Sequence, residues 1–220
     1  MTAVHHVERV GNRRDSALQV IDAQYGGLLT AAASVLVVTR SWRRTPQRLV
    51  EDGHTYDVRL SRTPGGWRVT AVHPSAPGRA ARRLTPAARR VLASDHIALP
   101  PAAELDLRAG RIHDTVLRAL LTLAASYRIH ISVLRSGHPL YVFGTDRLSD
   151  HPPGRAFDTW AINGQRVVSP STPRALVEGY MRAAAEAGSY NVGGPYLLGS
   201  APQWFSDDTH HDHVHAGFAE

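Results

Sequence analysis

Hydrophobic and polar residues alternate most clearly in two short stretches of the first third of the chain, residues 55–60 and 67–72. The residues between them, Pro64, Gly65 and Gly66, are typical of a hairpin turn. Residues 31–42 change from small to β-branched side chains, which also favours a strand. The pattern therefore predicts three antiparallel strands in this part of the chain.

A helix is predicted just before these strands. Leu18, Ile21 and Tyr25 recur at helical spacing, and Gly26 follows as a stop signal. Residues 1–75 are thus expected to form a small α+β accessory unit. Its segment 65–70 weakly resembles the last strands of NTF2-like domains.

A change of composition separates this unit from the rest. Residues 73–78 are rich in Pro, Gly and Ser, and Thr85 followed by Pro86 is a typical helix start. We expect residues 76–111 to be a linker that carries one short helix.

The second half of the chain predicts a larger α+β domain over residues 112–220. Two helices are expected, over residues 113–127 and from Pro173 to Gly188, each with an apolar face. Strands are expected over residues 129–134 and 156–162 and again near the end of the chain. The expected fold is an antiparallel sheet with packed helices.

Composition narrows the function. With 220 residues and 43% hydrophobic residues the chain can bury a core, and with no cysteine it has neither disulfides nor thiolate metal ligands. Residues 1–112 hold 17 arginines against 9 acidic residues, so this basic half is an alternative candidate for nucleic-acid binding. It lacks a dense arginine run with interleaved aromatic residues, and we expect no specific nucleic-acid partner.

Membrane and export signals are also missing from the sequence pattern. The apolar run over residues 28–38 is shorter than the roughly 20 residues that span a bilayer. It begins too late for a signal peptide and lacks a cleavage site. We expect no transmembrane segment and no signal peptide.

Candidate chemistry lies at two separated motifs. His151 and Asp158 flank a turn of Pro152, Pro153 and Gly154, and Asp158 falls on the strand predicted over residues 156–162. His213 and His215 are two residues apart in a strand pattern, so both imidazoles would point to one face. Two histidines and a carboxylate, with a fourth position left to water, are typical of catalytic zinc sites.

These motifs resemble a known family. Ser149-x-His151-x-x-Gly154-x-Ala156-x-Asp158, followed by a late His-x-His, resembles the bacterial cell-wall zinc peptidases. This group includes D-Ala-D-Ala carboxypeptidases and L-Ala-D-Glu endopeptidases, and it shares its fold with the Hedgehog signalling domain. The resemblance covers about residues 112–220. It implies a Zn²⁺ cofactor held by His151, Asp158 and His215.

The resemblance also implies the substrate and some of the catalytic residues. The substrate would be peptidoglycan stem peptides with D-amino acids, cut by a metal-activated water at the cell envelope or outside the cell. Asp212 matches the family's general base, whereas strand geometry places His213 on the face of His215. We expect Asp212 as the base, with His213 holding the base or the tetrahedral intermediate.

Residues around the predicted ligands have supporting roles. Arg135 and Ser136 match an Arg-Ser pair whose arginine faces the substrate in the resembled family, and Ser149 is expected to support the ligand loop. Nothing in the spacing of His130 and His138 fits a ligand set, so both are predicted to be bystanders.

Two other interpretations of the histidines stay open. The domain can be a non-catalytic, zinc-stabilised binding module for wall or peptide ligands, or residues 210–215 can be a histidine-rich tail that binds metal loosely. The sequence alone leaves the peptide bond, the stereochemistry and the oligomeric state open.

Overall fold

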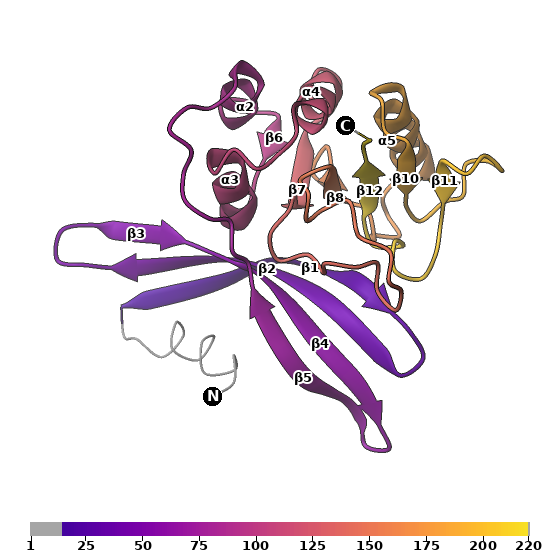
Figure 1. Cartoon of the computed structure of the whole chain (residues 1–220), viewed down its shortest axis with the longest axis horizontal. Helices are drawn as coiled ribbons and strands as arrows, with labels where there is room; N and C mark the ends of the chain where they lie inside the picture. The colour runs from indigo at the N-terminus through magenta and orange to yellow at the C-terminus, as the bar shows by residue number, and fades with distance from the viewer. Residues whose placement is uncertain (1–14, 220) are drawn as a thin grey trace.

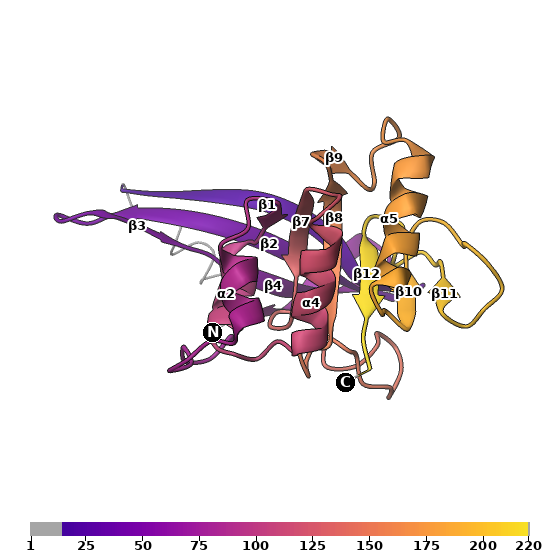
Figure 2. The ribbon, with the colours of Figure 1, turned by 90° about the horizontal axis from the view of Figure 1, so that it is seen from above.

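The computed structural model describes residues 15–219 and arranges them in three layers (Figure 1). Helices form one outer layer, a seven-stranded sheet lies in the middle, and a five-stranded sheet forms the other outer layer. The helix over residues 101–108 is the exception, because it lies beside the middle layer, next to the first sheet. Seen from above, helices lie in front of the strands (Figure 2). The α+β class is therefore confirmed.

The first sheet is antiparallel throughout and has the order β1-β2-β4-β5, with β3 paired to β2. Its strands are β1 (Ser16–Leu28), β2 (Ala32–Arg44), β3 (Leu49–Asp52), β4 (Thr55–Thr63) and β5 (Gly66–Pro74). The three predicted strands and the β4–β5 hairpin are confirmed, and β3 was not predicted.

The helix predicted around Leu18, Ile21 and Tyr25 is wrong, because these residues lie on β1. Leu18 and Val20 are exposed, whereas Asp22 and Gln24 are buried. The strand therefore directs these two polar side chains inward, where they contact polar partners. Leu18, Ile21 and Tyr25 have the spacing of a helix although they lie on a strand. The described part of the amino-terminal unit, residues 15–75, is consequently all β rather than α+β.

The second sheet has the order β11-β10-β12-β8-β7-β6, with β9 paired to β8. Its strands are β6 (Ile97–Ala98), β7 (Ile129–Val133), β8 (Ala156–Ile162), β9 (Gln165–Arg166), β10 (Asn191–Gly193), β11 (Trp204–Phe205) and β12 (Val214–Gly217). The predicted strands at β7, β8 and β12 are confirmed. The sheet is antiparallel only at its centre, since β6–β7 and β10–β11 are parallel pairs.

Four helices in the described residues cover the second sheet: α2 (Pro86–Leu92), α3 (Pro101–Arg108), α4 (Asp114–Leu123) and α5 (Arg174–Glu186). Thr85 caps α2 as predicted, by accepting a hydrogen bond from the N–H of Ala88. Val91 of α2 and Leu107 of α3 join the same apolar core as α4 and α5. The segment expected to be a linker with one short helix thus holds two helices and a strand, and it contributes to the core of the second half.

Both faces of β8 are covered. Phe157 lies in the apolar core beneath the helices, and Thr159 bonds to Tyr180 of α5 at 2.8 Å. The alternate residue, Asp158, points to the opposite face and meets Gln24 of β1. The carboxylate of β8 therefore lies between the two sheets.

No helix in the stretch from Asp15 to Ala219 is long and apolar enough to cross a bilayer. Residues 1–14, over which no signal peptide is predicted, lie outside the described residues.

Candidate metal centre

The three predicted ligands come from two neighbouring strands and a turn. His215 on β12 is directly paired with Asp158 on β8, so their side chains share the face toward the first sheet. His151 approaches from the turn that precedes β8. All three are nearly or completely buried.

Their donor atoms converge on one point. Nε2 of His151 lies 3.2 Å from Oδ1 of Asp158 and 3.2 Å from Nδ1 of His215. Nδ1 of His215 lies 3.0 Å from the same carboxylate oxygen. Tetrahedral ligands about 2.0–2.1 Å from a metal ion are about 3.3–3.4 Å apart, so the three atoms are close to the spacing of ligands on one ion.

The proton count also fits a metal. Nδ1 of His151 lies 3.0 Å from the carbonyl oxygen of Leu134, which assigns its proton to that nitrogen and leaves a lone pair on Nε2. A ligand histidine usually has its second nitrogen fixed by a carbonyl in this way. Two ring nitrogens and a carboxylate oxygen then face one another with at most one proton, that of Nδ1 of His215, to share among them, and a cation satisfies all three.

The turn that carries His151 needs glycine at position 154. Gly154 has φ +81°, and its N–H donates to the carbonyl of His151 at 2.7 Å. A Cβ there would lie 2.0 Å from the carbonyl oxygen of Arg111. The glycine therefore lets the turn pack tightly enough to place His151 over Asp158.

The electrostatics keep the ligands ready for a cation. Burial alone would raise the pKa of Asp158, but the imidazoles of His151 and His213 outweigh it and hold this pKa well below its usual range. Burial lowers the pKa of His215 to about 4, against the opposing effect of Asp158. An ionised carboxylate and a neutral imidazole are the forms that bind metal.

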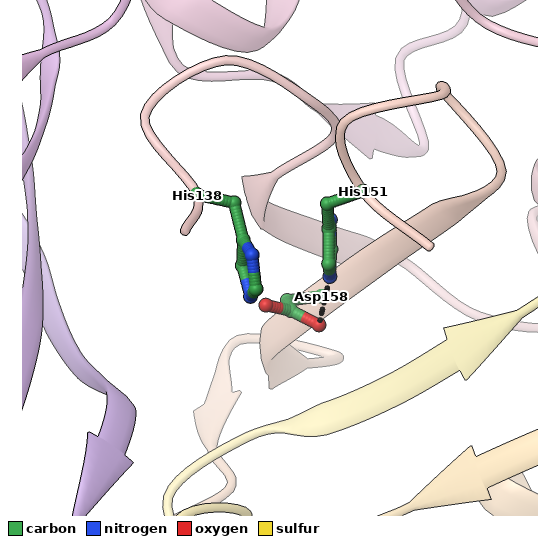
Figure 3. A group of neighbouring side chains, drawn as sticks. All are labelled: His138, His151 and Asp158. Carbon is green, nitrogen blue, oxygen red and sulfur yellow. Dashed lines mark hydrogen bonds and ion pairs between the residues drawn. The ribbon is translucent and has the colours of Figure 1, made fainter. Parts of the chain in front are cut away.

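His138 also reaches the centre, contrary to its prediction as a bystander. One ligand atom each of His138, His151 and Asp158 lie within 4.8 Å of one another, so this group can also hold a metal ion (Figure 3). The rings of His138 and His151 are stacked, however, with centroids 4.1 Å apart and planes only 17° apart. A bound ion lies in the plane of its imidazole, so an ion in the plane of His151 lies outside that of His138. The planes of His151 and His215 differ by 59°, which favours His215 as the third ligand.

Asp212 and His213 form a second, buried pair beside the ligands. Oδ1 of Asp212 lies 2.7 Å from Nδ1 of His213, and Oδ2 accepts the N–H of Tyr25 at 2.9 Å. Nε2 of His213 points the other way and lies 3.7 Å from Oδ2 of Asp158. β12 begins only at Val214, yet His213 keeps the face of His215. His213, rather than Asp212, therefore directs an atom toward the centre, where Asp158 is its neighbour.

The structure places the remaining predicted residues around the ligand turn. Ser149 Oγ accepts the N–H of His151 at 3.3 Å, and the N–H of Ser136 donates to Asp106 at 2.7 Å. Arg135 donates from Nε to the carbonyl of Pro152 at 3.1 Å and lies 3.6 Å from Asp106. It lines a smaller hollow of about 250 Å³ on the other side of His138.

A cleft of about 630 Å³ opens beside the centre. His138, His213 and His215 line it, and so do the end of β1 and the first residue after it, Tyr25 to Leu29. Phe143 and Phe205 add apolar walls, while several charged residues lie near the opening, among them Arg147, Asp150, Asp207 and Asp208. The centre is thus accessible to a ligand from one side.

Two residues at the centre were not identified from the sequence. His138 approaches it through the turn at Gly137, and only the Arg-Ser-Gly-His order near the motif could have indicated this. Gln24 donates to Asp158 from the first sheet, 134 residues away in sequence. The only available signal was the polar pair Asp22 and Gln24 at strand spacing.

Comparison of the chain with protein-family models, with curated proteins and with solved structures finds no match in any of the three.

Proposed function

We propose that this protein is a zinc-dependent peptidase that hydrolyses peptidoglycan stem peptides at bonds involving D-amino acids. The observation that carries the proposal is the set of three donor atoms 3.0–3.2 Å apart beside a cleft of about 630 Å³. Two nitrogens and a carboxylate oxygen suit Zn²⁺, and three protein ligands leave a position for water. The resemblance to cell-wall peptidases supplies the substrate class and a Hedgehog-like fold for the second half.

In this proposal His151, Asp158 and His215 hold the zinc. The bound metal would lower the pKa of its water and polarise the scissile carbonyl. The cleft walls of Phe143 and Phe205 would bind the apolar parts of the peptide and exclude water.

The contacts favour His213 as the proton acceptor and Asp212 as its partner. Both oxygens of Asp212 are already engaged, by His213 and by the N–H of Tyr25. Nε2 of His213 faces the ligand Asp158 and lines the cleft, so it can accept and return a proton there. Asp212 would fix the ring and stabilise its protonated form, which exchanges the roles predicted from the sequence.

Purified wall fragments and synthetic stem peptides test the proposal, with products identified by mass with and without a chelator. We expect about one zinc per chain and release of D-Ala or shortened stem peptides that stops when the metal is removed. His213→Ala should keep its zinc and lower kcat about 10²- to 10⁴-fold. Activity that survives complete loss of zinc would contradict the proposal.

The engaged carboxylate of Asp212 also favours a second candidate, a zinc-stabilised module that binds wall or peptide ligands without cutting them. The same variants separate the two. If the wild-type protein binds stem peptides and releases no product, and Asp212→Ala and His213→Ala leave that binding unchanged, the module is the correct assignment.

A further inference from the structure

Gln24 of β1 touches the metal centre from outside the region that resembles the peptidases. Its Nε2 donates to Oδ2 of Asp158 at 2.7 Å, and the side chain is only 1% exposed. Oδ1 of the same carboxylate faces His151 and His215. The amide therefore occupies the oxygen that the other ligands leave free.

The amide is itself held in place. Ser132 of β7 donates from Oγ to Oε1 of Gln24 and also lies 3.2 Å from the carbonyl oxygen of Asp158. Ser132 is fully buried. An ionised carboxylate only accepts, so Gln24 presents its NH₂ group to Asp158 and leaves Oε1 to accept the hydroxyl of Ser132. This contact fixes both the position of Gln24 and its orientation.

Further contacts lock β1 along the centre. Asp22 pairs with Arg166 at 2.7 Å, Tyr25 donates its N–H to Asp212, and Leu28 donates its N–H to Thr209 at 3.2 Å. Two residues after Tyr25, a Cβ on Gly27 would lie 2.1 Å from Phe143, so the backbone of β1 directly contacts the cleft wall. Contacts on both sides of Gln24 therefore hold β1 in a fixed position against the second half.

We propose that Gln24 is a positioning residue of the metal centre, and that the first sheet is thereby a working part of the site rather than an accessory unit. This inference rests on the metal binding in the proposed function. A carboxylate whose second oxygen is bonded to a fixed amide cannot rotate and offers Oδ1 alone to the ion. Losing such an outer contact typically weakens metal affinity about 10- to 100-fold.

Zinc competition against a chromophoric chelator tests this on the full chain. Gln24→Met keeps the volume and removes the donor, so we expect its zinc Kd to rise about 10- to 100-fold. Gln19→Ala, an exposed glutamine on the same strand, is the matched control and should bind like the wild type. Ser132→Ala frees the amide without removing it and should have a smaller effect in the same direction.

Two further measurements distinguish an effect of Gln24 on the metal centre from an effect on packing alone. The thermal midpoint of the metal-free Gln24→Met protein reports packing, and the visible spectrum of the Co²⁺-loaded protein reports ligand geometry. A changed spectrum with weaker zinc binding supports the inference. A zinc Kd within about twofold of the wild type with an unchanged spectrum overturns it, whatever the shift in midpoint. If Gln24→Met does not fold, Ser132→Ala with its Co²⁺ spectrum decides by the same criteria.

Failure of this inference differs from failure of the proposed function. If the wild type binds zinc and cuts no peptide, the peptidase proposal fails while the effect of Gln24 on zinc affinity still stands or falls by itself. If the wild type cuts stem peptides and Gln24→Met binds zinc equally well, only the role of Gln24 is wrong. A wild type that binds no zinc overturns both.

Discussion

On one face of β8, Phe157 and Thr159 meet the helices, and on the other Asp158 meets His151, His215 and Gln24. The helix face is an apolar core with one hydroxyl pair, whereas the opposite face is a polar network. Both are buried, and of the residues named on the polar face only His215 reaches the cleft. The second half therefore carries an apolar core on one side of its sheet and the candidate metal centre on the other, where the first sheet packs against it.

The largest expected effect is the loss of a ligand from the polar face. His215→Ala should bind almost no zinc after dialysis, compared with about one ion per chain in the wild type, because two protein ligands cannot hold the ion. His138→Ala should retain its zinc, since the ring of His138 is stacked on His151 rather than directed at a common ion. Metal analysis by mass spectrometry measures both. The opposite outcome, zinc lost in His138→Ala and kept in His215→Ala, would reassign the third ligand.

Phe157→Ala tests the other face at the neighbouring position. The side chain is fully buried and packs near Phe218, so its removal should lower the free energy of unfolding by about 3–5 kcal/mol. Urea denaturation of the metal-free protein measures this, with Val168→Ala, an exposed residue, as the control. The zinc affinity of the folded protein should stay near that of the wild type. A joint loss of stability and affinity would show that the two faces are not independent.

The same contrast explains what the sequence could predict. β8 was predicted correctly because its small, apolar and β-branched residues are typical of a strand and a turn of Pro and Gly precedes it. The set His151, Asp158 and His215 was implied by the resemblance to the cell-wall peptidases, and the pairing of β12 with β8 and the tight turn before β8 place these residues in the structure. The structure brings these predicted ligands together.

The contribution of the first sheet could not be predicted in this way. Gln24 is buried only because β1 packs against a strand 134 residues away, and a buried amide on a strand breaks the usual alternation. Because the buried positions of β1 hold polar residues, its sequence lacks the apolar alternation of a strand and was interpreted as a helix. His138 was likewise missed because its place depends on how the loop before His151 folds. Both residues act through tertiary contacts that leave no periodic pattern.

The contact between the sheets should also give a pH signature. Burial raises the pKa of Asp22 to about 6 from 3.8, with Asp212 raising it further and Arg166 opposing it. Protonated Asp22 therefore contributes fully to the free energy of unfolding below pH 3.8, and this contribution is lost as the pH rises through about 6. Asp22→Asn stays neutral, so it should gain stability relative to the wild type by about 2–3 kcal/mol between about pH 4 and pH 7.

Urea denaturation of both proteins at several pH values checks this. Asp22→Asn lacks the ion pair with Arg166 at every pH. The way in which the difference in unfolding free energy between variant and wild type changes with pH therefore reports the titration of Asp22. His213 also faces this carboxyl, and His213→Ala in both backgrounds separates its contribution. A difference that stays flat over this range would mean that water reaches Asp22 between the sheets.

The smallest expected effect compares single hydrogen bonds on the two faces of β8. Tyr180→Phe removes the hydroxyl that bonds to Thr159 at 2.8 Å and leaves one buried oxygen without its partner. We expect a loss of about 1–2 kcal/mol in the free energy of unfolding and no change in zinc Kd. Thr159→Val with Tyr180→Phe should largely cancel the loss, because both polar groups are then gone. Gln24→Met likewise removes one hydrogen bond to β8, on the opposite face. If Tyr180→Phe and Gln24→Met changed the zinc Kd equally, the two faces of β8 would not have separate roles.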